Sequence, residues 1–143
     1  MKIAVVYFSR GGNTRKIAEV IAEELEVTAV DVKKEQPDVS EVDLLVVGSG
    51  TYGSTPGKEL VTYLENLKPV AGIKAACFSS CASGDASKTL QVMKDILSQK
   101  GYSPVDCFSC LGKFLMGLSR RGHPSDEELA QARAFAKKLK STV

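Results

Sequence analysis

The stretch Phe8-Ser9-Arg10-Gly11-Gly12-Asn13-Thr14 decides the fold, because it separates two segments with different periodicity. Residues 2–8 form a nearly continuous apolar run, which predicts a strand covered on both faces. Residues 14–25 place apolar side chains at helical spacing. A strand that turns through glycines into a helix leaves several backbone N–H groups unpaired, and the helix dipole makes that end positive. The stretch therefore predicts a phosphate-binding loop.

The order of residue types from Ser9 to Thr14 resembles the phosphate loop of flavodoxins, S/T-x-T-G-N-T. In that family, hydroxyls and amides of this loop hold the terminal phosphate of FMN. Gly11 stands where the family usually has threonine, so one hydroxyl is missing. The stretch is neither a Walker loop nor a G-x-G-x-x-G dinucleotide fingerprint. An ordinary glycine-rich turn is the alternative interpretation.

The composition is that of a soluble globular protein. The chain has 143 residues and 43% hydrophobic content, which suffices for one domain with a substantial core. The net charge is +2 with both signs interspersed, and this gives no support to nucleic-acid binding. Neither a signal peptide nor a membrane-spanning run can be recognised. We therefore expect one cytoplasmic domain over residues 1–143, without stable membrane association.

Strands and helices alternate along the rest of the chain. Further strands are predicted at 27–32, at 44–47 with an end at Gly48, at 74–78 and at 102–108. Further helices are predicted from Pro56 to before Pro69, over 86–100, and after a capping box formed by Ser125 and Glu128. This alternation predicts an α/β fold with a three-layer, doubly wound, five-stranded parallel sheet. A phosphate loop after the first strand suggests the flavodoxin-like strand order 2-1-3-4-5, with ligands at the carboxyl ends of strands one and three.

In that topology, residues 48–57 and 79–85 share one rim with the phosphate loop. Residues 48–57 look like the flavin loop of the family, where an aromatic side chain lies against the isoalloxazine and a glycine follows. Tyr52 and Gly53 match those positions, although a flexible turn with a surface tyrosine is the alternative. In the family, the loop that corresponds to residues 79–85, the third loop, flanks the pyrimidine edge of the flavin with backbone N–H groups. The resemblance assigns cofactor binding to Ser9, Arg10, Gly11, Gly12, Asn13, Thr14, Ser49, Gly50, Thr51, Tyr52, Gly53, Ser79, Ser80, Cys81, Gly84 and Asp85.

The four cysteines do not indicate a disulfide framework in a chain without secretory features. Cys77 and Cys107 lie on predicted strands and are expected in the core. Cys81 and Cys110 follow neighbouring strands, so they could approach each other. Reduced, dispensable thiols are favoured over a disulfide, and a disulfide over a metal site. His123 is interpreted as a turn residue, and no catalytic or metal-binding residues are assigned.

The resemblance covers the whole chain and implies a short-chain flavodoxin that binds FMN and shuttles single electrons between redox proteins. We expect a monomer or weak dimer. One alternative is a flavin enzyme on the same fold, either an NAD(P)H-dependent quinone or nitro reductase or a protoporphyrinogen-oxidase-like protein. Another is a regulatory domain that binds no flavin. A basic collar that attracts an acidic partner or an anionic substrate is a further hypothesis. Its residues are Arg10, Lys58, Lys88, Lys113, Arg120 and Arg121. Ordinary solvated surface charge is the alternative, and it is favoured for Lys58 and Lys88.

Overall fold

The computed structural model describes residues 2–52, 54–81, 86–111 and 126–142, with only the main chain for Cys81, Cys110, Leu111 and Thr142. Strands and helices alternate as predicted, and among the described residues no helix lies between the second and third strands, just as none was predicted between residues 27–32 and 44–47. The elements are β1 (Ile3–Phe8), α1 (Asn13–Glu24), β2 (Ala29–Asp31), β3 (Leu44–Gly50), α2 (Lys58–Glu65), β4 (Ile73–Cys81), α3 (Ser87–Gln99), β5 (Tyr102–Leu111) and α4 (Asp126–Thr142). Ser125, the first residue of the predicted capping box, lies outside the described residues.

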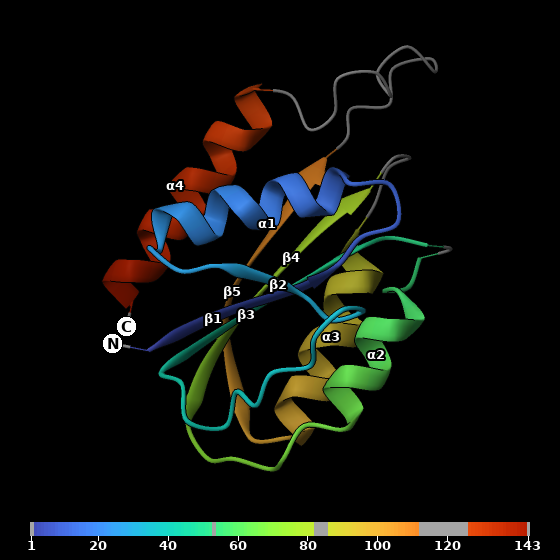
Figure 1. The fold of residues 1–143 in the computed structure, drawn as a ribbon, viewed down its shortest axis with the longest axis vertical. Coiled ribbons are helices and arrows are strands. Elements are labelled where there is room, and N and C mark those ends of the chain that lie inside the picture. Colours follow the sequence, from blue (N-terminus) through green and yellow to red (C-terminus); the bar gives the residue numbers. More distant parts are fainter. Residues whose placement is uncertain (1, 53, 82–85, 112–125, 143) are drawn as a thin grey trace.

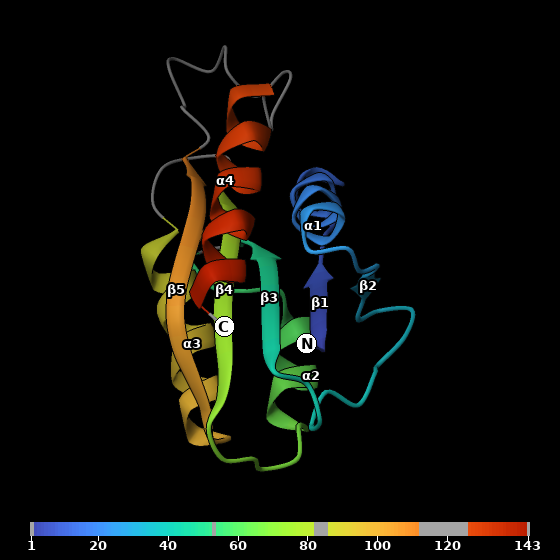
Figure 2. The same ribbon diagram turned by 90° about the vertical axis from the view of Figure 1, so that its left-hand side faces the viewer.

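The five strands form one parallel sheet in the order β2-β1-β3-β4-β5, which confirms the predicted fold (Figure 2). Val5 of β1 illustrates the register, since it pairs with Ala29 on one side and with Val46 on the other. Because all pairs are parallel, all strands end at the same edge of the sheet. The segments that follow β1, β3 and β4 therefore start from one rim.

Two pairs of helices cover the two faces of the sheet (Figures 1 and 2). Helices α1 and α4 pack on one face, where Ile17 and Ala136 meet Val46 and Phe78 in one apolar cluster. Helices α2 and α3 pack on the other face in a second cluster. The central strand β3 is buried along its whole length. Its uninterrupted apolar start, Leu44 to Val47, is the pattern expected of a strand covered on both faces.

Strand β3 continues to Gly50, so the predicted end at Gly48 is wrong. The reason is the neighbouring strand, where Phe78 pairs with Gly48 in register. A Cβ atom on Gly48 would lie 2.0 Å from the Phe78 ring. Gly48 therefore makes room for an aromatic side chain inside the sheet and does not mark a turn.

The expectation that Cys107 belongs to the core is also wrong, because its side chain is exposed. Cys107 pairs with Cys77 in register, but β5 is the edge strand and the helices do not cover it at that point. Cys77 is fully buried, and this burial raises the pKa of its thiol to about 12. At neutral pH the Cys77 thiol is thus protonated and poorly nucleophilic.

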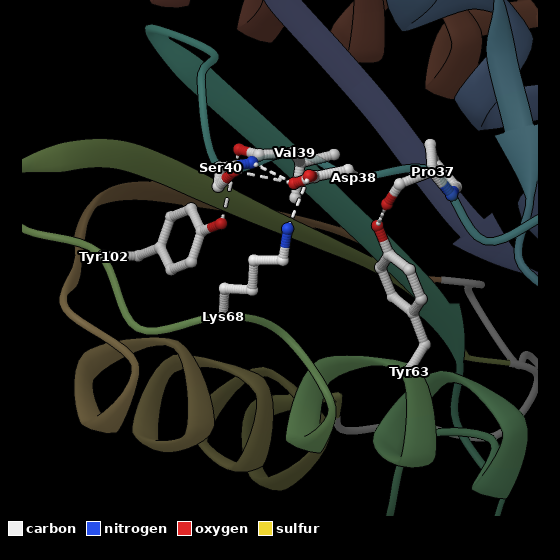
Figure 3. A network of polar contacts seen from close by, with 7 residues as sticks. All are labelled: Pro37, Asp38, Val39, Ser40, Tyr63, Lys68 and Tyr102. Atoms are coloured by element: carbon white, nitrogen blue, oxygen red, sulfur yellow. Dashed lines mark hydrogen bonds and ion pairs between the residues drawn. The ribbon is translucent and has the colours of Figure 1, made fainter.

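The connection between β2 and β3 runs past α2 and the start of β5 near the amino-terminal edge of the sheet (Figure 3). It has little regular structure, but Val39 within it is buried. The Tyr63 hydroxyl donates to the Pro37 carbonyl at 2.7 Å, and the Tyr102 hydroxyl donates to the Val39 carbonyl at 3.4 Å. These bonds fasten the connection to α2 and to the start of β5.

Candidate functional site

The phosphate loop turns at Gly12, which has a φ of 90° and precedes the first residue of α1. This left-handed conformation suits glycine, because other residues adopt it only at a cost. The Gly12 N–H donates to the Ser9 Oγ at 2.9 Å, and the Gly12 carbonyl accepts the N–H of Lys16 at 3.1 Å. The loop is thereby curled around the start of the helix, whose first-turn N–H groups have no acceptors within the helix.

Thr14, in the first turn of α1, connects this loop to β4. Its Oγ1 lies 2.7 Å from the Oγ of Ser80, and either atom can be the donor. The Thr14 side chain is almost completely buried. A hydroxyl has one proton and two lone pairs, so Thr14 can accept from Ser80 and donate its own proton elsewhere.

The loop of residues 48–57, the second loop, is held in place by the Ser49 side chain. The Ser49 hydroxyl is fully buried; it donates to the Gly50 carbonyl at 2.8 Å and accepts the Gly57 N–H at 2.9 Å. It therefore supports the loop and does not reach its surface. Thr51 contacts Ser79 at 3.0 Å through their hydroxyls, and the Thr51 N–H donates to the Ser80 carbonyl at 2.9 Å.

Tyr52 bridges the first two loops. Its hydroxyl accepts the N–H of Arg10 at 3.1 Å, and the Arg10 guanidinium carbon lies 4.4 Å from the centre of the Tyr52 ring. Phe8, at the end of β1, meets the ring edge-on with centroids 6.1 Å apart. In the main chain, Tyr52 and Thr55 exchange N–H···O bonds of 2.8 and 3.3 Å. This exchange closes a tight turn in which Ser54 has a φ of 66°.

The structure thus brings together the residues predicted from all three loops, as far as it describes them. Gly53, Ala82, Gly84 and Asp85 lie outside the described residues, as do Lys113, Arg120, Arg121 and His123. In the register of β4 and β5, Cys81 pairs with Leu111 and Cys110 pairs with Ser80. Cys81 and Cys110 are thus one register position apart on neighbouring strands. That their thiols are reduced and not joined in a disulfide stays a prediction.

Sequence reasoning missed Phe8 as a site residue. The sequence predicts Phe8 only as the last residue of a strand, yet its ring contacts Tyr52, and a Cβ atom on Gly57 would lie 2.2 Å from it. The available signal was an aromatic residue directly before the phosphate loop. Among the described residues, no helix is long and apolar enough to cross a membrane, and no three or more His, Cys, Asp or Glu side chains gather as metal ligands would.

The flavodoxin-like class of α/β proteins has three layers, with a parallel sheet of order 2-1-3-4-5 between two layers of helices. Its binding loops lie at the carboxyl ends of the strands, as the loops after β1, β3 and β4 do here. The protein-family model described as "Flavodoxin domain" matches residues 4–116 of the chain. The chain belongs to the flavodoxin family, as a flavodoxin-like flavoprotein.

Several proteins are similar to the chain over nearly its whole length. An uncharacterized protein of Methanocaldococcus jannaschii is 30% identical over 97% of this chain and 98% of its own. The structure of oxidised Flavodoxin 2 from Bacillus cereus is similar with a TM-score of 0.73 and 23% identity, and the match covers both chains fully. A Streptococcus pneumonia flavodoxin reaches a TM-score of 0.76 at 19% identity over 99% of each chain. At these identities the two structures show the shared fold.

Proposed function

We propose that the chain is one FMN-binding domain over residues 1–143 that carries single electrons between redox proteins in the cytoplasm. The observation that carries this proposal is the phosphate loop. Gly12 turns the chain into α1, and the Ser9 and Thr14 hydroxyls lie beside the helix start. Hydroxyls and amides at a positive helix end suit a phosphomonoester, which FMN has and riboflavin lacks.

The residues present fit FMN on chemical grounds. The Ser9 hydroxyl accepts the Gly12 N–H, so its own proton remains available for a phosphate oxygen. The half-buried Tyr52 ring stands between the phosphate loop and the second loop, and Gly53 and Gly84 are proposed to contact the flavin ring through their main chains. When bound, FMN supplies the redox chemistry, and the protein holds it and sets its electrostatic surroundings.

The test is a titration of the purified protein with FMN and with riboflavin, followed by quenching of flavin fluorescence. FMN should bind more tightly by orders of magnitude, because only FMN engages the phosphate loop. Equal affinity for the two flavins would rule out this use of the loop. Potentiometric titration of the FMN-loaded protein should then resolve two separate one-electron potentials, as a single-electron carrier requires.

A reductase on the same fold is the second candidate function. It is favoured by three exposed basic residues, Arg10, Lys58 and Lys88. Arg10 follows β1, Lys58 is the first residue of α2, and Lys88 lies in the first turn of α3. Positive charge at these positions suits an anionic substrate. Stopped-flow mixing of the FMN-loaded protein with NADPH and a quinone separates the two functions. Rapid turnover would favour the reductase, and slow reduction by NADPH would favour the carrier. The proposed monomer or weak dimer is checked by sedimentation.

A further inference from the structure

The position of the Tyr52 hydroxyl does not follow from a ring-stacking role alone. Three contacts hold this side chain against the phosphate loop. The Arg10 N–H donates to the hydroxyl at 3.1 Å, the Arg10 guanidinium lies over the ring at 4.4 Å, and the Phe8 ring supports its edge. The hydroxyl is therefore fixed at the second residue of the phosphate loop.

Gly50 makes this placement possible. A Cβ atom on Gly50 would lie 2.5 Å from the Tyr52 hydroxyl oxygen and 2.7 Å from the ring carbon that bears it. Gly50 is the buried last residue of β3, and its missing side chain leaves the space through which Tyr52 reaches back to the phosphate loop. Gly50 and Tyr52 thus combine to place the Tyr52 hydroxyl at the phosphate loop.

The proton of this hydroxyl is available to a ligand. A phenol has one proton and two lone pairs, and one lone pair of Tyr52 accepts the Arg10 N–H. Within the part of the chain that the structure describes, no acceptor takes the phenolic proton. The Ser9 hydroxyl has the same arrangement, since it accepts the Gly12 N–H. A phosphate dianion accepts hydrogen bonds and donates none, so it selects hydroxyls arranged in this way.

Gly11 stands at the position where the family motif has a threonine hydroxyl. A Cβ atom on Gly11 would meet nothing within 4 Å, and Gly11 is not among the glycines with positive φ. The loop therefore has open space for a Cβ atom at the position of the threonine in the family motif, but lacks its hydroxyl. On the basis of the proposed function, we propose that the Tyr52 hydroxyl replaces that missing group. Tyr52 is then a phosphate-binding residue and a determinant of the preference for FMN over riboflavin.

The experiment compares wild type, Tyr52→Phe, Gly11→Thr and the double variant at constant ionic strength. Affinities for FMN and riboflavin are measured by fluorescence quenching. Tyr52→Phe should weaken FMN binding by about ten- to hundredfold, the range for a hydrogen bond to a charged group. Riboflavin binding should not change, because the aromatic ring remains. Adding Gly11→Thr to Tyr52→Phe should restore most of the lost preference for FMN.

Tyr63→Phe is the matched control, because it removes the same atom from a tyrosine that is remote from the loop. It should leave both flavin affinities unchanged. An unchanged ratio of FMN to riboflavin affinity in Tyr52→Phe would overturn the inference and leave the proposed function intact.

If wild type shows no preference for FMN, the proposed function fails, and inorganic phosphate then tests the hydroxyl separately. Phosphate should raise the melting temperature of wild type more than that of Tyr52→Phe, with potassium chloride at equal ionic strength as reference. Equal shifts, or no shift in either protein, would overturn the role of Tyr52 in anion binding.

Discussion

Tyr52 and Tyr63 use the same hydroxyl group in opposite directions. Tyr52, at the carboxyl-terminal edge of the sheet, accepts a hydrogen bond from the Arg10 N–H. Tyr63, on α2, donates its proton to the Pro37 carbonyl, as Figure 3 shows. The first arrangement leaves a proton for a ligand, whereas the second uses the proton within the fold. The direction of the hydrogen bond thus separates a tyrosine suited to binding from one that stabilises the structure.

The surroundings of the two side chains differ in the same sense. Tyr63 is buried within the apolar cluster under α2 and α3, and its burial raises the pKa of the phenol. The pKa of Tyr102, which donates to Val39 in the same region, is raised for the same reason. Tyr52 is only half-buried and lies at the rim. Stability is therefore expected to depend on Tyr63, and ligand selection on Tyr52.

The largest effect is expected from truncating the two side chains to alanine. Tyr63→Ala removes a buried ring and should lower the free energy of unfolding by about 3–5 kcal/mol. Its preference for FMN over riboflavin should stay as in wild type while the protein is folded. Tyr52→Ala should cost less than about 1 kcal/mol in stability and lose much of that preference. Urea unfolding and flavin titration of both variants measure the two quantities, and parallel losses in both would break the comparison.

The fold was predictable because its evidence is local. The apolar run of β1 and the helical spacing of Ile17 and Ile21 each lie within one segment. The errors arose where a distant segment decides the outcome. Gly48 resembles a turn residue until Phe78 is placed beside it, and Cys107 resembles a core residue until β5 is known to be exposed there.

The sequence indicated which loops share one edge of the sheet, but not the contacts between them. Thr14 and Ser80 are 66 positions apart, and Arg10 and Tyr52 are 42 apart. No spacing in the sequence indicates that these pairs share hydrogen bonds. The resemblance assigned Ser80 to the edge of the flavin ring, whereas the structure places its hydroxyl on Thr14 of the phosphate loop. Such pairings depend on how the loops meet above the sheet.

The next effect separates the two adjacent glycines of the phosphate loop. Gly12 has a φ of 90°, and a Cβ atom in that conformation costs roughly 1–2 kcal/mol. Gly12→Ala should therefore weaken FMN binding by about tenfold as the loop distorts. Gly11→Ala is the matched control, because its Cβ atom meets open space. FMN titration of both variants is the measurement, and equal losses would show that the glycines act through flexibility alone.

A smaller effect concerns the stability of the protein in alkali. The pKa of Tyr63 is raised in the folded state, mainly by burial. Its contribution is fully present below the ordinary pKa of about 10 and decreases as the pH rises above it, because the unfolded state ionises first. Tyr63→Phe should cost about 1 kcal/mol at pH 7, from the lost bond to Pro37, and should show a flatter decline above pH 10. Urea midpoints measured from pH 7 to 11 check this, and an identical alkaline decline in both proteins would contradict it.

The smallest effect is expected at Asp38, on the connection that Tyr63 holds. The Ser40 hydroxyl and N–H donate to one carboxylate oxygen at 2.7 and 2.9 Å, and Lys68 Nζ lies 3.1 Å from the other. These bonds, those from Ser40 first, lower the pKa of Asp38 to about 2. The stabilisation is therefore present above the ordinary pKa near 4 and is lost as the pH falls towards 2. Because the carboxylate and Lys68 are both well exposed, water and salt weaken the contribution.

Asp38→Asn should slightly lower the stability at pH 7 and remove part of its decline between pH 4 and 2. Carboxyl titration by NMR sharpens the test, since Ser40→Ala should raise the Asp38 pKa more than Lys68→Met does. The reverse order would mean that the ion pair holds this connection and that the serine does not. FMN binding should be unchanged in all three variants, because the connection lies near the amino-terminal edge of the sheet and the phosphate loop at the other.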